Sequence, residues 1–432
     1  MADKRRRAAV VGASLGGLSA AQVLQDSGFV VTVFEKHGAP FSDRGGGLSC
    51  NVPYDAIRPR APRPPPFEMN ALTREHPDGP AAPCSQPAVA YGRLWDWLRD
   101  GVADLRLGAA VADVKDGPGG AHIVLAGGAD RGPYELVVLA DGGRSTLRRR
   151  VDATATPTYS GFCLYRGLAP LAALGGRADG TFFLWQHGDT RLDGYAVGPA
   201  LNWGVTAPAP EPPRRPKGDA PPHAYAGAGD ADVDAAVARA AAAFPTPWPA
   251  AVPATVVAAT AGGGRPVVRH PLYHLAAARA SRGRLALLGD AAHLFSPLVG
   301  SGLRAAMLDA IALKACLAAG GGDVAAALGR YDAATRAHRF DFAARSAQAL
   351  AALRAGARFR LPLARPVGGV RAASFFDAAR DDPPDVDLEP DTTDDDEDRR
   401  YRARVKKHPN DLDLPIIARM FEDVLACSHR DG

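Results

Sequence analysis

The chain has 432 residues, of which 47% are hydrophobic and 23% are charged. This composition excludes fibrous and wholly disordered proteins, and the length allows two or three domains. A formal net charge of +4 is too small to predict nucleic-acid binding. The five cysteines include no C-x-x-C pair, which argues against a disulfide framework or a zinc site. Without a signal peptide or a run of about 18 apolar residues, we expect a cytoplasmic protein with no stable membrane insertion.

The N-terminal residues have the pattern of a βαβ unit. Residues 8–12 form an apolar run that ends in glycine, which is typical of a buried parallel strand. A helical pattern follows from Leu15 to Leu24, and a second β-branched run from Phe29 to Phe34 ends at Glu35. Strand, helix and strand in this short space predict two parallel strands joined by a helix.

The loop between the first strand and the helix reads GASLGG, over residues 12–17. It matches the dinucleotide fingerprint except that Ser14 replaces the second glycine. Gly12 allows the tight turn, a small residue at position 14 lets backbone N–H groups approach a pyrophosphate, and Gly17 lets the helix pack closely. Glu35 is placed to accept hydrogen bonds from an unphosphorylated ribose, as in FAD or NAD. The predicted cofactor-binding residues here are Gly12, Ser14, Leu15, Gly17, Glu35 and Lys36.

Later segments indicate further strands and loops. Residues 53–89 are rich in proline and predict loop and short strands, whereas Tyr159–Thr206 alternates aromatic runs with glycine turns and predicts antiparallel sheet. Residues 207–222 predict a surface loop. The acidic residues 381–398 predict a mobile segment, followed by a short helix at about 412–427.

Two downstream motifs choose between the cofactors. Residues 141–148, DGGRSTLR, resemble the D-G-x-x-S-x-x-R segment of flavoprotein aromatic hydroxylases. Residues 289–302, GDAAHLFSPLVGSG, resemble the G-D-A-A-H…P-x-x-G-x-G segment of the same enzymes. With the N-terminal loop, three motifs stand in the family's order over about residues 6–350. The chain is therefore similar to the FAD-dependent aromatic hydroxylases, or class A flavoprotein monooxygenases, and residues 159–167 look most like the 2,6-dihydroxypyridine 3-monooxygenase branch.

The resemblance implies roles for individual residues at FAD. Asp290 would accept hydrogen bonds from the ribitol, and the segment from Pro297 leads into a helix whose N-terminus would face the pyrimidine end of the isoalloxazine. Arg44 would reach the phosphates or the ribitol, with a solvent-facing arginine as the alternative. The remaining residues implied in cofactor binding are Asp141, Gly142, Gly300, Gly302 and Leu303.

The resemblance also implies the reaction. NADH or NADPH reduces the flavin, O2 adds at carbon 4a, and the C4a-hydroperoxyflavin transfers one oxygen to a small aromatic or heteroaromatic substrate. The predicted catalytic residues are His293, Pro297 and Tyr195. His187 and Tyr165 are further candidate bases, while Trp185 and Phe183 either line the substrate cavity or pack in the sheet.

Two departures from the family keep other functions open. Tyr91 stands where the family commonly has an arginine that contacts the pyrophosphate, and Arg304 stands where it usually has asparagine. These changes put the tightness of FAD binding in doubt. The alternatives are a flavoprotein reductase or dehydrogenase without oxygen insertion, and a catalytically degenerate scaffold. The oligomeric state also stays open, with a homodimer among the alternatives.

The fold class that we predict is α/β, of the para-hydroxybenzoate-hydroxylase type. It comprises a Rossmann-like three-layer FAD-binding domain with an inserted antiparallel β-sheet substrate domain. The predicted FAD-binding domain is discontinuous, over residues 6–75, 90–158 and 265–350. The substrate domain would occupy residues 159–264, and residues 351–432 would form a helical and acidic C-terminal extension.

Overall fold

A computed structural model gives the fold. It describes residues 6–42, 46–49, 54–57, 67–74, 82–170, 180–212 and 267–357. Arg44, the acidic segment 381–398 and the helix predicted at 412–427 lie outside these residues. Within them, no helix combines the length and the apolar character needed to cross a membrane.

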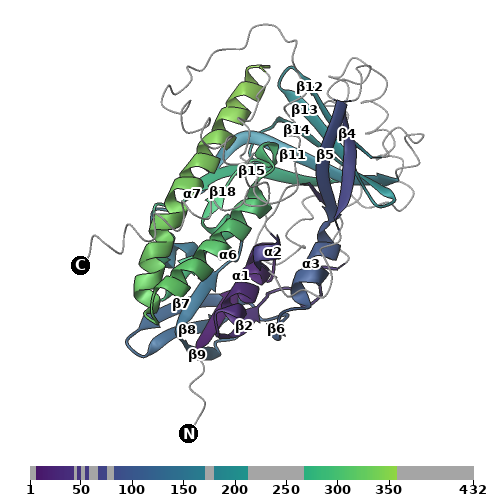
Figure 1. Cartoon of the computed structure of the whole chain (residues 1–432). Coiled ribbons are helices and arrows are strands. Elements are labelled where there is room, and N and C mark those ends of the chain that lie inside the picture. The colour runs from purple at the N-terminus through teal and green to yellow at the C-terminus, as the bar shows by residue number, and fades with distance from the viewer. Residues whose placement is uncertain are drawn as a thin grey trace, which may run out of the picture.

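A six-stranded sheet forms the centre of one half of the molecule (Figure 1). Its strands pair in parallel except for the edge pair β16–β17. In spatial order they are β16 (Ser281–Arg282), β17 (Leu285–Leu287), β10 (Leu136–Leu139), β1 (Arg7–Val11), β2 (Val30–Phe34) and β6 (Asp104–Arg106). Helix α1 (Leu15–Asp26) joins β1 to β2, which confirms the predicted βαβ unit.

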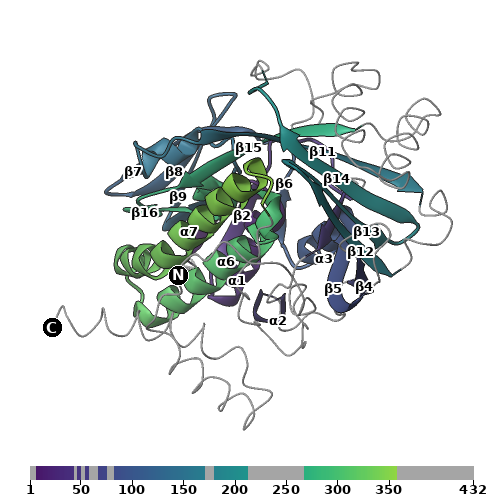
Figure 2. The same cartoon turned by 90° about the horizontal axis from the view of Figure 1, so that it is seen from above.

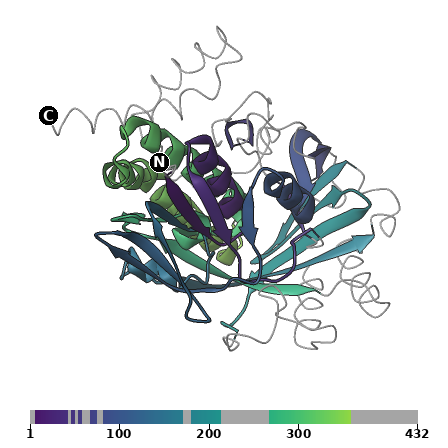
Figure 3. The same cartoon turned by 90° about the horizontal axis from the view of Figure 1, so that it is seen from below.

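The two faces of this sheet are buried by different partners. Ala8 and Val10 of β1 share a core with α1, α3 (Tyr91–Arg99) and α6 (Gly302–Ala319). Ala9 and Val11, which point to the opposite face as strand geometry requires, pack on a three-stranded antiparallel sheet. That sheet comprises β7 (Val111–Gly117), β8 (Gly120–Leu125) and β9 (Asp130–Tyr134). Figure 3 shows the central sheet between the helices and these strands, so the three-layer architecture is confirmed.

A nine-stranded sheet forms the other half of the molecule (Figure 2). Its central strands run antiparallel through residues 158–208, which confirms the predicted antiparallel sheet. In spatial order the strands are β18 (His293–Leu294), β15 (Val268–Ala276), β11 (Thr158–Pro170), β14 (Ala200–Pro208), β13 (Thr190–Val197), β12 (Thr181–His187), β4 (Glu68–Arg74), β5 (Ala82–Ala90) and β3 (Gly47–Ser49).

The large sheet also includes strands outside residues 159–264, the range predicted for the substrate domain. β4 pairs in parallel with β12, and β15 pairs with β11 from the other side. Strands β4 and β5 fall in the proline-rich residues 53–89, where short strands were predicted. The domain boundaries themselves stay a prediction.

Helix α7 (Val324–Arg354) connects the two halves. Figure 2 shows α7, α6 and α1 side by side, and the C-terminal end of α7 packs against the large sheet. There Leu350 and Leu353 share a core with Phe162 of β11 and with Leu298 of the short helix η4 (Pro297–Val299). One face of the large sheet is therefore held against the segment that carries the third motif.

The remaining described elements are short. They are helix α2 (Tyr54–Ile57) and the single-turn 3-10 helices η1 (Leu147–Arg150) and η3 (Gly289–Ala291). Helices η1, η3 and η4 all fall within or beside the second and third motifs, so these motifs form turns at the ends of strands β10 and β17.

Candidate functional site

The glycines of the N-terminal loop are required by its geometry. Gly12 has a φ of +101°, and a Cβ atom there would lie 2.4 Å from the carbonyl oxygen of Ala140. A Cβ atom on Gly17 would lie 1.9 Å from the carbonyl oxygen of Gly12. Only glycine fits either position. This agrees with the tight turn and the close helix packing for which the two residues were selected.

Hydrogen bonds hold the loop from two sides. The Ala13 N–H donates to Glu35 Oε2 at 2.9 Å, and Trp95 Nε1 of α3 donates to the Ala13 carbonyl at 2.7 Å. Glu35 is only 5% exposed, and its other oxygen accepts from the His37 N–H at 3.0 Å. Each carboxylate oxygen can accept more than one hydrogen bond, so these contacts leave capacity for a ribose. Lys36 beside it is exposed.

The second motif borders open space and is tied to the third. Gly142 has a φ of +83°, and a Cβ atom there would have no neighbour within 4 Å. Arg148, which is 1% exposed, donates to the carbonyls of Gly142 at 2.9 Å and Gly143 at 2.6 Å. The same Nη2 lies 3.5 Å from the carbonyl oxygen of Asp290. The sequence analysis assigns no role to Arg148, although it is the last residue of the D-G-x-x-S-x-x-R motif.

Asp141 supplies a test of whether this loop fits a ligand. Its Oδ1 atom is buried without a hydrogen-bond partner among the residues that the structure describes. Burial raises the pKa of the carboxyl, while a hydrogen bond with Ser145 and the charge of Arg148 oppose the rise. A buried acceptor without a donor is costly. The atom therefore fits a hydroxyl or N–H group of a bound cofactor.

A buried hydrogen-bond cluster lies beneath the third motif. Asp309 of α6 is fully buried and accepts from the Gly289 N–H at 2.9 Å. Its oxygens also meet His293 Nε2 at 2.8 Å and His338 Nε2 of α7 at 2.7 Å. Because a carboxylate only accepts, both Nε2 atoms carry a proton. Asp290, next to Gly289, is exposed and open to a ligand.

The two histidines offset the cost of burying the Asp309 carboxylate. Burial alone would raise the pKa of Asp309, but the charge of His293 and the hydrogen bonds from His293 and His338 outweigh it and lower the pKa. Two histidines and one carboxylate are also a metal-ligand set. The two histidine contacts have ordinary hydrogen-bond lengths, so a proton at each Nε2 accounts for the geometry without an ion.

The rest of the third motif ends at a helix N-terminus. Pro297 and Gly300 are exposed, and Gly300 has a φ of +59°. Cβ atoms at Gly300 and Gly302 would have no neighbour within 4 Å. Helix α6 starts at Gly302 without a side-chain cap, so its first N–H groups can meet an anionic ligand. Leu303 is half-buried and Arg304 is 9% exposed.

Strand alternation sorts the aromatic candidates onto two faces of the large sheet. Tyr165, Phe183 and Trp185 belong to one buried core. For Phe183 and Trp185 this supports packing in the sheet over lining the substrate cavity. Tyr195 lies on the opposite face, where its ring stacks on Phe182 with centroids 5.2 Å apart. That face is the one held against η4 through Phe162 and Leu164 of β11. His187 ends β12 and is exposed.

The face that carries Tyr195 also carries a polar group absent from our predictions. Arg166 and Asn202 occupy positions of β11 and β14 on this face. Arg166 Nε donates to Asn202 Oδ1 at 3.1 Å, and its Nη2 donates to the Gly47 carbonyl. The Gly47 N–H donates to Asn202 Oδ1 at 2.7 Å. The signal in the sequence was a single arginine within an otherwise apolar strand.

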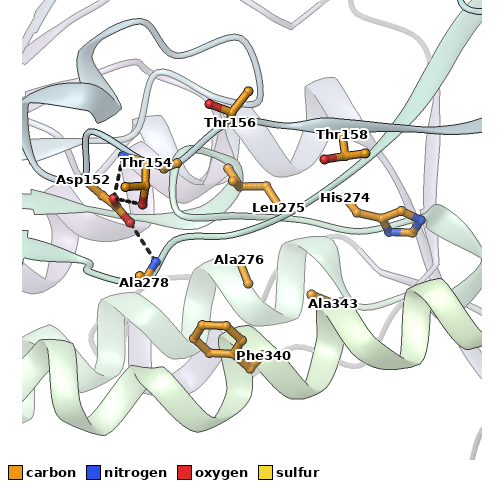
Figure 4. A pocket seen from close by; sticks show the side chains of 11 residues that line it. Asp152, Thr154, Thr156, Thr158, His274, Leu275, Ala276, Ala278, Phe340 and Ala343 are labelled. Carbon is orange, nitrogen blue, oxygen red and sulfur yellow. Dashed lines mark hydrogen bonds between the residues drawn. The ribbon is translucent and has the colours of Figure 1, made fainter.

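A separate pocket of about 320 Å³ lies between β15, the start of β11 and α7 (Figure 4). Asp152, His274 and Phe340 line it, and no residue of the three motifs does. Both oxygens of Asp152 already accept hydrogen bonds, from Thr154 and from the N–H groups of Ala278 and Arg279. We assign this pocket no part in the candidate site.

Three loops thus follow the adjacent parallel strands β1, β10 and β17, at the edge where open α/β sheets bind ligands. Together with a buried acid after β2 and an uncapped helix N-terminus, they define a dinucleotide-binding flavoprotein. Comparisons with known proteins agree. A family model for the FAD binding domain matches residues 265–344, and one for an NAD(P)-binding Rossmann-like domain matches residues 10–61.

Two curated relatives are monooxygenases by name. Aurachin C monooxygenase/isomerase of Stigmatella aurantiaca is 32% identical over 262 residues, which make up 60% of this chain and 62% of that protein, less than two thirds of its length. The 3-amino-4-hydroxybenzoate 2-monooxygenase of Streptomyces cremeus is 28% identical over 369 residues, 77% of this chain and 84% of that protein. Both relatives are named as monooxygenases, and over these stretches the chain is similar to the FAD-dependent aromatic hydroxylases, the class A flavoprotein monooxygenases.

Solved structures agree in fold. The 2,6-dihydroxypyridine-3-hydroxylase from Arthrobacter nicotinovorans has a TM-score of 0.71 at 18% identity, covering 84% of this chain and 96% of that chain. This likeness bears out the fold class, whereas the narrower resemblance to the dihydroxypyridine branch stays a prediction.

Proposed function

We propose that the chain is an FAD-dependent monooxygenase that uses NADH or NADPH and O2 to hydroxylate a small aromatic or heteroaromatic ring. The observation that carries the proposal is the joining of the three motif loops at one sheet edge. Arg148 ties the second loop to the third, and the face of the large sheet that carries Tyr195 packs against the third through η4. A cofactor held by these loops would lie beside that face.

Each loop would bind a different part of FAD. The loop from Gly12 to Ser14 would bind the pyrophosphate, Glu35 the ribose and Asp290 the ribitol. The N-terminus of α6 would stabilise negative charge at the isoalloxazine by about 0.3–2 kcal/mol. Bound FAD supplies the chemistry, because it accepts hydride equivalents from the nicotinamide and activates oxygen for transfer.

The substrate would lie between η4 and the face that carries Tyr195. The stacked rings of Phe182 and Tyr195 suit an aromatic compound, and Arg166 and Asn202 provide polar groups on the same face. Two of the relatives are named 3-amino-4-hydroxybenzoate 2-monooxygenase and 2-heptyl-3-hydroxy-4(1H)-quinolone synthase. We therefore propose an electron-rich ring with a hydroxyl or amino substituent.

The catalytic role of His293 stays a prediction, and its surroundings support a second role. Its side chain is fully buried and its Nε2 is bonded to Asp309. We propose that His293 is a positioning residue that fixes the turn carrying Asp290. Pro297 and Tyr195 stay predicted as residues next to the reacting ring.

The test begins with the absorbance spectrum of the purified protein, which should show the two visible bands of oxidised flavin. NADH and NADPH are then added in air with a panel of phenols, hydroxypyridines, aminohydroxybenzoates and quinolones. A ring compound should accelerate nicotinamide oxidation and take up one atom of 18O from labelled O2. Product without 18O would support the reductase alternative, and failure to bind added FAD would support the scaffold alternative.

A further inference from the structure

Ser14 departs from the dinucleotide fingerprint and Tyr91 departs from the family pattern, and the two residues meet in space. The hydroxyl oxygens of Ser14 and Tyr91 lie 2.8 Å apart although 77 residues separate them in the chain. Ser14 is the N-cap residue of α1, yet its side chain does not cap that helix. Tyr91 is the first residue of α3. The serine hydroxyl is therefore committed to the tyrosine rather than to its own helix.

Helix α3 supports the loop at two successive residues. Trp95, one turn after Tyr91 on the same face of α3, donates from Nε1 to the Ala13 carbonyl at 2.7 Å. Tyr91 reaches the next residue of the loop, Ser14. The ring of Tyr91 packs partly against the main core, and its backbone N–H donates to the Gly46 carbonyl at 2.9 Å. The side-chain hydroxyl and the backbone N–H of Tyr91 therefore both make hydrogen bonds.

Given the FAD site of the proposed function, on which this inference rests, we propose that Ser14 and Tyr91 form an uncharged pyrophosphate-binding pair. The phenol, the stronger acid, donates to Ser14 Oγ, and the exposed Ser14 hydroxyl then donates its own proton to a phosphate oxygen. A chain of two hydroxyls strengthens the outer donor. The positive end of α1 begins at the same residue.

The pair explains why serine replaces glycine at this position. A glycine would present backbone N–H groups only, whereas Ser14 adds a hydroxyl that Tyr91 orients. The two residues then depend on each other. Removing either hydroxyl removes the 2.8 Å hydrogen bond that orients the other one.

The experiment is a double-mutant cycle on FAD affinity, measured by quenching of flavin fluorescence as apo-protein is added. Tyr91→Phe keeps the ring and removes the hydroxyl, and Ser14→Gly restores the fingerprint residue. Each single variant should raise the dissociation constant about tenfold, equal to about 1.4 kcal/mol. Because the two hydroxyls act as one unit, the dissociation constant of the double variant should also rise about tenfold. Two independent residues would instead raise it about a hundredfold.

Tyr273→Phe is the matched control, because its hydroxyl also makes a 2.8 Å bond to a side chain, that of Glu211. It should leave the FAD dissociation constant unchanged. Unchanged affinity in both single variants, or a hundredfold loss in the double variant, would overturn the pair. If Tyr91→Phe fails to fold, Ser14→Ala, which removes the hydroxyl at an exposed position, should raise the dissociation constant about tenfold, and an unchanged value would overturn the pair. A wild-type protein that binds no FAD would instead overturn the proposed function.

Discussion

Replacing Asp309 with asparagine should destabilise the protein strongly. The carboxylate accepts three hydrogen bonds, from the Gly289 N–H, His293 and His338. Asparagine keeps one oxygen and turns an NH2 group toward a histidine N–H, so at least one donor loses its partner in a buried site. Hydrogen bonds to a charged group contribute about 1.5–3 kcal/mol each, and breaking a buried charged network costs about 3–5 kcal/mol. We expect a loss of about 3–5 kcal/mol.

The assay is urea unfolding at pH 7, followed by tryptophan fluorescence. The matched control is Asp341→Asn on α7, where the carboxylate is 50% exposed and pairs with Arg345. This control should change the free energy of unfolding by less than about 0.5 kcal/mol. A loss below about 1 kcal/mol in Asp309→Asn would refute the view that the cluster holds the turn at Gly289.

The same variant has a distinct pH dependence. The pKa of Asp309 is lowered in the folded protein, so the carboxylate stabilises the fold above its unfolded pKa of about 3.9. That contribution is lost as the pH falls toward the folded pKa. The difference in stability between wild type and Asp309→Asn should therefore narrow below about pH 4. A difference that stays constant as the pH falls well below about 4 would contradict the assignment.

Three further predictions concern other parts of the molecule. Gly17→Ala places a Cβ atom 1.9 Å from a loop carbonyl and should abolish FAD binding in a fluorescence titration. Burial raises the pKa of the Cys163 thiol, and that of Cys316 to about 12, so peptide mapping should find neither labelled by iodoacetamide at about pH 8 until urea is added. Tyr195→Phe should change the KM or kcat for the aromatic substrate and leave the FAD affinity unchanged. Tyr165→Phe, on the opposite face of the sheet, should leave KM and kcat unchanged. If Tyr165→Phe alters KM or kcat and Tyr195→Phe does not, the assignment of faces is refuted.

The sequence was most informative where structure depends on neighbouring residues. The loop at Gly12 and the helix that follows could be predicted because turn, strand and helix signals lie within a few residues of one another. The same holds for the start of α6, which follows a glycine-rich turn.

Contacts between distant segments could not be predicted in the same way. Nothing near His338 indicates that it meets Asp309 from another helix. Ser14 and Tyr91 were each noticed as departures, but their contact depends on how α3 packs on the loop. Alternation places Tyr195 and Trp185 on opposite faces of the sheet, yet which face meets the cofactor domain depends on the connections of the whole chain.

The order of strands in the central sheet has a consequence for synthesis on the ribosome. Strand β1 pairs with β10, which begins at Leu136, and β10 in turn pairs with β17, which begins at Leu285. Translation adds about 5–20 residues per second. The edge of β1 that pairs with β10 therefore stays unpaired for several seconds or more after β1 is synthesised, and the edge of β10 that pairs with β17 stays unpaired for longer. An open edge of this kind pairs readily with other chains. The nascent N-terminal half should therefore be the part of this protein that most needs a chaperone.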